Sequence, residues 1–174
     1  MFNLRFTLFA AMIAAFAAGV FAQTNTPAAA VTSFYKFSRS QSQDFNSRGI
    51  ESRKRWFSTP LYKLFLNELQ REKEFLKKNP TDMPFFGNGV PFQPIDETCE
   101  AGKRSYRYTY SVGKGEVNGD SATVPVSFTY PAQCKIPPTI YKVVLVKAKT
   151  GWLIDDMIYP NGPTLVADLK RTEY

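Results

Sequence analysis

The sequence contains no histidine. Imidazole is the usual general base near neutral pH, the partner of the nucleophile in Ser-His-Asp and Cys-His enzymes, and a frequent ligand of zinc. The absence of histidine therefore excludes both kinds of nucleophilic catalysis and any histidine-based zinc or iron site. We expect no metal ion and no other cofactor.

No acidic residue precedes Asp44, and the chain begins with the features of an export signal. The single charge of Arg5 is followed by an apolar run from Phe6 to Phe16. Val20 and Ala22 then offer small side chains at the two positions that signal peptidase requires before its cut. These features predict cleavage directly after Ala22.

We therefore expect residues 1–22 to be a cleavable signal peptide and residues 23–174 to form a single domain. Such a domain would be exported, either to the periplasm or out of the cell. A retained membrane anchor is the alternative, but the apolar run is shorter than the roughly 20 residues that span a bilayer. No stable membrane span is expected after cleavage.

Lysine and arginine outnumber aspartate and glutamate by 22 to 15, which gives a formal net charge of +7. Removing Arg5 with the signal peptide would leave +6. A basic balance can indicate an anionic partner, but export argues against nucleic acid. The run Arg53-Lys54-Arg55 is interpreted as a solvated helix face, with contact to an anionic surface as the alternative.

Only two cysteines are present, Cys99 and Cys134. An even number of cysteines in an exported protein favours a disulfide. The bridge would close a loop of about 35 residues, which is worth roughly 3–4 kcal/mol in the chain-entropy model. Two buried free thiols are the alternative, and the spacing excludes a Cys-x-x-Cys redox pair.

The period of the apolar residues is helical in the first part of the mature chain. The segment 80–98 then combines proline and glycine with aromatic residues, and we expect it to fold over the core or over the mouth of a cavity. The expected helices are 28–38, 50–57 and, after a capping Ser58, 60–78, with a polar loop between the first two.

After Cys99 the period changes to two, which predicts strands. Asn118-Gly119-Asp120 predicts a hairpin turn, and Pro125 predicts an edge position or a bulge for its strand. This order predicts an α+β domain with N-terminal helices packed on a mostly antiparallel sheet. The expected elements are strands 105–112, 123–130, 140–148 and 152–159 in two hairpins, and a final helix at 164–170 with Thr164 as its cap.

Three segments resemble a known family: VTSFYKF at 31–37, GEVNGDSATV at 115–124 and GWLIDDMIYP at 151–160, with Thr164-Leu165 after the last. They are similar to the cone-shaped, ketosteroid isomerase-like proteins of the nuclear transport factor 2-like superfamily, and to its exported bacterial group "domain of unknown function 3828". The resemblance implies a strongly bent sheet that leaves a central conical pocket. Since the superfamily contains both isomerase-like or dehydratase-like enzymes and binding modules, it implies where a ligand binds, not which reaction occurs.

Asp156 is the single candidate for a catalytic residue. On a regular strand it would share a face with Trp152, Ile154 and Ile158, and such apolar neighbours would raise the pKa of its carboxyl and suit a general base. The alternative is a structural carboxylate that accepts hydrogen bonds at the end of the strand. No complete catalytic set of the family can be matched onto the sequence.

Aromatic side chains dominate the candidate ligand-binding residues, because a stripe of rings on one strand face suits an apolar or ring-bearing ligand. Packing in the core, with hydroxyls reaching the surface, is the alternative. The candidates are Tyr106, Tyr108, Tyr110, Phe128 and Tyr130, joined by Trp152 and Asp156.

Together these features favour a non-enzymatic exported module that binds a small ligand or an envelope protein in a conical pocket or at its rim. The first alternative is an isomerase-like or dehydratase-like enzyme with Asp156 as general base. The second is an immunity or envelope-assembly protein that acts through its surface. The sequence leaves open whether the protein forms a homodimer.

Overall fold

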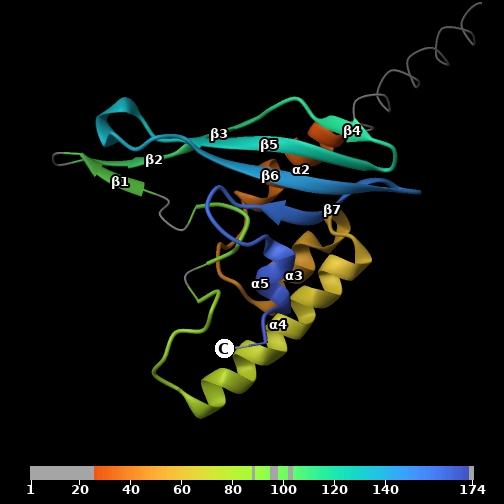
Figure 1. Ribbon diagram of the computed structural model, residues 1–174. Coiled ribbons are helices and arrows are strands. Elements are labelled where there is room, and N and C mark those ends of the chain that lie inside the picture. The colour runs from red at the N-terminus through yellow and green to blue at the C-terminus, as the bar shows by residue number, and fades with distance from the viewer. Residues whose placement is uncertain (1–25, 88, 95–97, 102–103, 173–174) are drawn as a thin grey trace, which may run out of the picture.

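The computed structural model describes residues 26–87, 89–94, 98–101 and 104–172, and the predicted signal peptide lies outside them. The described part is α+β, as predicted, with helices packed against a mostly antiparallel sheet (Figure 1). In this view α4 and α5 lie below the sheet, and the β1–β2 hairpin projects to one side. No helix in the described part is long and apolar enough to cross a membrane.

The first described helix, α2 (Pro27–Ser38), begins where the sequence predicts a helix. The Thr26 hydroxyl accepts the N–H of Ala29, which satisfies one of the free amide groups of the first turn. The predicted apolar face is buried, and it lies against β3, β5 and β7. The buried residues of this face are Val31, Phe34, Tyr35 and Ser38.

Two further helices precede the sheet. The helix α3 (Ser47–Arg53) starts three residues earlier than predicted, because the Asn46 side chain caps it by accepting the N–H of Gly49; the 3-10 turn η2 (Lys54–Trp56) follows. The long helix α4 (Thr59–Lys78) has the predicted cap, in which Ser58 accepts the N–H of Leu61.

The main sheet has the strand order β3-β5-β6-β7, and β4 also pairs with β5. The predicted turn is confirmed: Gly119, at φ +59°, and Asp120 connect β4 to β5. The strand of Pro125 is not at an edge, because β5 lies between β6 and the β3 and β4 strands. Instead, the pairing of β5 with β3 and β4 is interrupted beside Pro125, because β3 ends at Val112 and β4 begins only at Glu116. The missing N–H of proline therefore breaks no ladder hydrogen bond on this side. The bounds are β3 (Thr109–Val112), β4 (Glu116–Asn118), β5 (Ser121–Thr129), β6 (Thr139–Ala148) and β7 (Gly151–Ile158).

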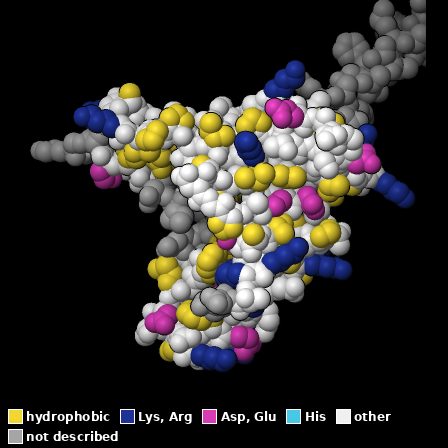
Figure 2. All heavy atoms as spheres, in the orientation of Figure 1, with side chains coloured by type: hydrophobic (Ala, Val, Ile, Leu, Met, Phe, Trp, Pro, Cys, Tyr) yellow, Lys and Arg dark blue, Asp and Glu magenta, His cyan; other side chains and the backbone are white. Residues whose placement is uncertain are grey.

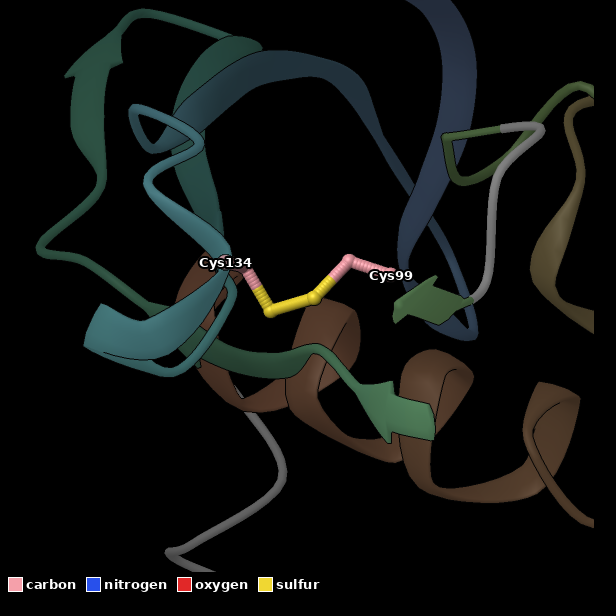
Figure 3. Close-up of a disulfide and its surroundings, with 2 residues drawn as sticks. All are labelled: Cys99 and Cys134. Atoms are coloured by element: carbon pink, nitrogen blue, oxygen red, sulfur yellow. A yellow bond between two sulfur atoms is a disulfide. The ribbon is translucent and has the colours of Figure 1, made fainter. Parts of the chain in front are cut away.

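The predicted strand 105–112 is wrong in one respect, since the structure divides it at Tyr108. Its first half, β2 (Arg104–Arg107), leaves the main sheet and pairs with β1 (Thr98–Ala101). The predicted disulfide joins Cys99 of β1 to Cys134 of the 3-10 turn η3 (Ala132–Cys134), with the two Cα atoms 5.9 Å apart (Figure 3). The bridge therefore ties the small hairpin to the segment that follows β5.

The face predicted for Asp156 is also wrong. A bulge shifts the register, so that Leu145 of β6 faces Ile154 whereas Val144 faces Asp156. One extra residue in β7 reverses the alternation, and Met157 rather than Asp156 lies on the buried face with Ile154.

Aromatic side chains fill the space between the helices and the sheet. The ring of Phe92, which comes from the loop after α4, lies 5.3–5.7 Å from three rings of the helical part. This loop therefore packs into the core, which was one of the two outcomes expected for it. The three partners of Phe92 are Phe34, Phe57 and Phe65, and none of these rings is more than 4% exposed.

Candidate functional site

An open cleft lies where the apolar loop after α4 meets the segment between β7 and α5 (Leu165–Lys170). We call it the rim cleft. Its volume is about 650 Å³ and its lining is mainly aromatic, proline and glycine residues. The lining residues are Phe85, Phe86, Gly89, Val90, Pro91, Gln93, Tyr141, Tyr159, Pro160, Asn161, Gly162, Pro163 and Asp168.

Side-chain hydrogen bonds help to hold the apolar loop in this position. The Tyr35 hydroxyl donates to the carbonyl of Phe92 at 2.7 Å, and the Tyr159 hydroxyl donates to that of Pro91 at 3.1 Å. Closer to α4, the buried Glu72 carboxylate accepts the N–H of Phe86 at 2.8 Å. A proline-rich loop has few partners of its own, so these side chains give the wall of the cleft a defined shape.

The titratable groups that line the rim cleft are two tyrosines and one carboxylate. Burial raises the pKa of the Tyr141 hydroxyl to about 12, and burial raises the pKa of Tyr159 further. Both therefore stay protonated and can donate a hydrogen bond. Tyr159 uses its proton on Pro91, but Tyr141 has no hydrogen-bond partner among the described residues. The Tyr141 hydroxyl is thus free to bind a ligand oxygen.

Asp168 of α5 completes this polar group. Its pKa is raised, mainly by burial and also by the charge of Asp156, while Arg171 opposes the shift. Burial disfavours the charged form of this carboxyl relative to that of an exposed one.

The predicted aromatic stripe is only partly assembled. Tyr108 and Tyr130 are buried beside one another with ring centroids 5.7 Å apart, and Tyr108 also meets Phe128 at 5.3 Å. Tyr110 packs on Tyr35 of α2, whereas Tyr106 lies in the separate β1–β2 hairpin. Tyr108 also lines a small hollow at the surface, whereas Trp152 belongs to the buried core.

Asp156 serves the backbone. Its Oδ1 accepts the N–H of Met157 at 2.7 Å and the N–H of Val166, in the first turn of α5, at 2.9 Å. A carboxylate at this position stabilises the start of a helix. The geometry is that of the structural carboxylate named as the alternative.

The three residues of the basic run, Arg53-Lys54-Arg55, differ in burial. Arg53 is fully buried, which contradicts the prediction of a solvated face, whereas Lys54 and Arg55 are exposed. The Arg53 guanidinium donates to the Ser38 hydroxyl and to the carbonyls of Ser38, Ser42 and Gly49 at 2.8–3.2 Å. Lysine, arginine and acidic side chains are interspersed on the face shown in Figure 2, with no continuous basic surface.

Sequence reasoning missed Tyr141, Tyr159 and Asp168. The first two stand in predicted strands, and nothing in the local pattern marks them as neighbours of the loop after α4. The composition of segment 80–98 was the available signal, because it already pointed to a cavity mouth.

No group of histidine, cysteine and acidic side chains suited to a metal ion occurs in the described ranges. Comparison of the chain with protein-family models, with curated proteins and with solved structures finds no match.

Proposed function

We propose that this protein is a binding module that takes an apolar small molecule into the rim cleft. The observation that carries the proposal is an open cleft of about 650 Å³ whose wall contains the Tyr141 hydroxyl, which has no hydrogen-bond partner in the described part of the chain. Ligand sites commonly combine an apolar lining with a few polar groups that orient the ligand. Tyr141 would donate to a ligand oxygen while the rings and prolines contact its apolar part.

The proposed architecture is the nuclear transport factor 2-like cone that the sequence resembles. In that arrangement Phe92 fills the interior, and the ligand is taken at the rim rather than at the centre of the cone. The disulfide supports a further part of the proposal, which is export to an oxidising compartment such as the periplasm or the cell exterior.

The enzyme hypothesis has less support. A general base needs a free carboxylate oxygen facing the bound substrate. The Oδ1 of Asp156 already accepts two backbone N–H groups, and Asp156 is not among the residues that line the rim cleft.

A fluorescent probe tests the binding proposal. Nile red is uncharged and becomes brighter in apolar sites, so titration with the purified protein should give saturable binding. Asn161→Trp places a large ring on the exposed loop that lines the cleft, and we expect it to weaken Nile red binding at least about tenfold, or about 1.4 kcal/mol.

Thr150→Trp is the matched control, because it adds the same ring to the exposed β6–β7 turn outside the cleft. This variant should bind Nile red like the unmodified protein. Equal affinity in all three proteins, or no saturable binding at all, would refute the proposed site. If the probe binds as expected, native mass spectrometry of protein taken from the cell envelope would identify the natural ligand.

A further inference from the structure

A second, smaller hollow adjoins the rim cleft at Gln93, which lines both. Its volume is about 220 Å³. Unlike the rim cleft it is polar, because its wall combines the loop after α2 with the end of β2. The other lining residues are Arg39, Gln41, Gln43, Arg107 and Tyr108. We call this hollow the arginine pocket.

The arginine pocket contains two positive charges that form no ion pair with a carboxylate of the described residues. The ion pairs between described residues involve Glu51, Glu68 and Glu74, and neither Arg39 nor Arg107 takes part in one. Guanidinium groups stay charged at any pH that the folded protein meets. Two such groups in one pocket suit an oxyanion, which can accept several of their N–H donors at once.

The pocket is held in shape from both sides. The Arg39 guanidinium lies over the rings of Tyr108 and Tyr110, 5.6 and 5.4 Å from their centroids. On the other side, Arg107 pairs with Thr98 at the end of the β1–β2 hairpin, next to the disulfide-bonded Cys99. The disulfide therefore fixes the strand that carries the second arginine.

The Gln43 amide adds a polar atom that lacks a partner. Its Nε2 donates to the carbonyls of Ser38 and Gln41, which leaves Oε1 buried with no hydrogen bond among the described residues. A buried acceptor in this state is unfavourable, because it has lost its hydrogen bonds to water. A hydroxyl or amide donor beside the anionic group of a ligand would satisfy it.

A row of aromatic rings underlies the path between the two hollows. Successive centroids are 5.3 Å apart from Tyr108 to Phe128, then 5.2 Å from Phe128 to Tyr141 and 5.2 Å from Tyr141 to Tyr159. The row begins in the wall of the arginine pocket and ends in the wall of the rim cleft. One ligand can thus contact charge at one end and an apolar surface at the other.

We propose that the ligand is an amphiphilic anion, whose carboxylate or phosphate head binds Arg39 and Arg107 while its apolar tail lies in the rim cleft. This inference rests on the proposed function, because the tail occupies the same cleft. An anionic head group also gives a role to Arg39 and Arg107, which form no ion pair within the described part of the chain.

Matched tails separate the contribution of the head from that of the tail. Dodecanoate and dodecyl phosphate carry an anionic head, and dodecanol carries the same tail without charge. We expect both anions to bind the purified protein at least about tenfold more tightly than dodecanol in calorimetry. Added salt should weaken the binding of the anions and leave that of dodecanol unchanged.

The double variant Arg39→Gln with Arg107→Gln should abolish this advantage and leave dodecanol binding intact. Lys36→Gln with Arg104→Gln is the control, since both residues are exposed cations outside the pocket, one in the last turn of α2 and one at the start of β2. An advantage that persists in the arginine variant, or that disappears equally in the control, would overturn the inference.

The remaining outcomes separate the two proposals. If Nile red and dodecanol bind but the anions have no advantage, the inference fails and the proposed function stands. If no probe binds, both fail. If inorganic phosphate alone binds as tightly as dodecyl phosphate, the tail has no site and the amphiphile proposal is wrong. A preference between the two anions would identify the head group as a carboxylate or a phosphate.

Discussion

At the scale of the residue, the buried charges of this protein are structural. Arg53 is the clearest case, since its guanidinium is buried and its acceptors among the described residues are hydroxyl and carbonyl oxygens. Burial lowers its pKa, but it stays protonated because an arginine begins from a very high value. Arg53 thereby connects the end of α2, the following loop and α3.

Arg53→Ala should destabilise the protein by about 3–5 kcal/mol, because it leaves several buried oxygens without donors and opens a cavity. Urea denaturation followed by circular dichroism measures the change. Arg48→Ala, at an exposed position of the same helix, should change the stability by less than about 0.5 kcal/mol. Similar losses in the two variants would contradict this account of Arg53.

Glu72 predicts a pH dependence. Burial raises the pKa of this carboxyl in the folded state, although the Phe86 N–H opposes the shift. The folded state therefore binds the proton more strongly than the unfolded state does, and this contribution to stability is lost as pH rises through the folded pKa.

Glu72→Gln removes the titrating group and keeps an acceptor for Phe86. The difference in melting temperature, variant minus unmodified protein, should thus become more positive as the pH rises from about 4 to about 7. Differential scanning calorimetry gives the comparison. The pKa of the exposed Glu74 is instead lowered by its hydrogen bond to Lys77, so Glu74→Gln should not show this increase.

At the scale of the element, contacts between segments decide what each strand and helix presents. The helix α4 was predictable because its cap and its apolar stripe are local features. The division of strand 105–112 was not, because β2 leaves the sheet to pair with β1. The helix α5 was also predictable, because Thr164 caps it locally by accepting the N–H of Ala167. Its second cap, the Asp156 carboxylate ten residues earlier in β7, was not.

Asp156→Ala should therefore destabilise the protein by about 1–2 kcal/mol through the loss of this cap, and Asp156→Asn by less, since the amide keeps an acceptor oxygen. Chemical denaturation measures both variants, with Asp155→Ala as the control on the same strand. The structural role would be contradicted if Asp156→Ala left the stability unchanged and instead abolished a reaction that the protein catalyses on a bound ligand.

At the scale of the whole molecule, the disulfide restricts the unfolded chain as well as the fold. Replacing Cys99 and Cys134 together by serine should cost roughly 3–4 kcal/mol in the chain-entropy model, because the bridge spans 35 residues. Thermal unfolding measures the loss. Intact mass after alkylation provides the control: the unmodified protein should react only after reduction, and labelling of unreduced protein would contradict the bridge.

The candidate site also belongs to the scale of the whole molecule. Its tyrosines stand in β6 and after β7, its loop follows α4, and its carboxylate lies in α5. The composition of the loop indicated a cavity mouth, but periodicity alone could not show which side chains face it. The aromatic stripe was assigned to the pocket by the same periodicity and is largely core.

By itself, the sequence determined the α+β class, the ends of α4, the hairpin turn at Gly119, the cysteine pair and the exclusion of histidine chemistry. These follow from composition or from interactions between near neighbours in the chain. Only the tertiary structure decided the burial of Arg53, the face of Asp156, the insertion of Phe92 and the meeting of Arg39 with Arg107. The physical reason is that periodicity shows which face of an element is apolar, whereas bulges and long-range contacts determine what that face meets.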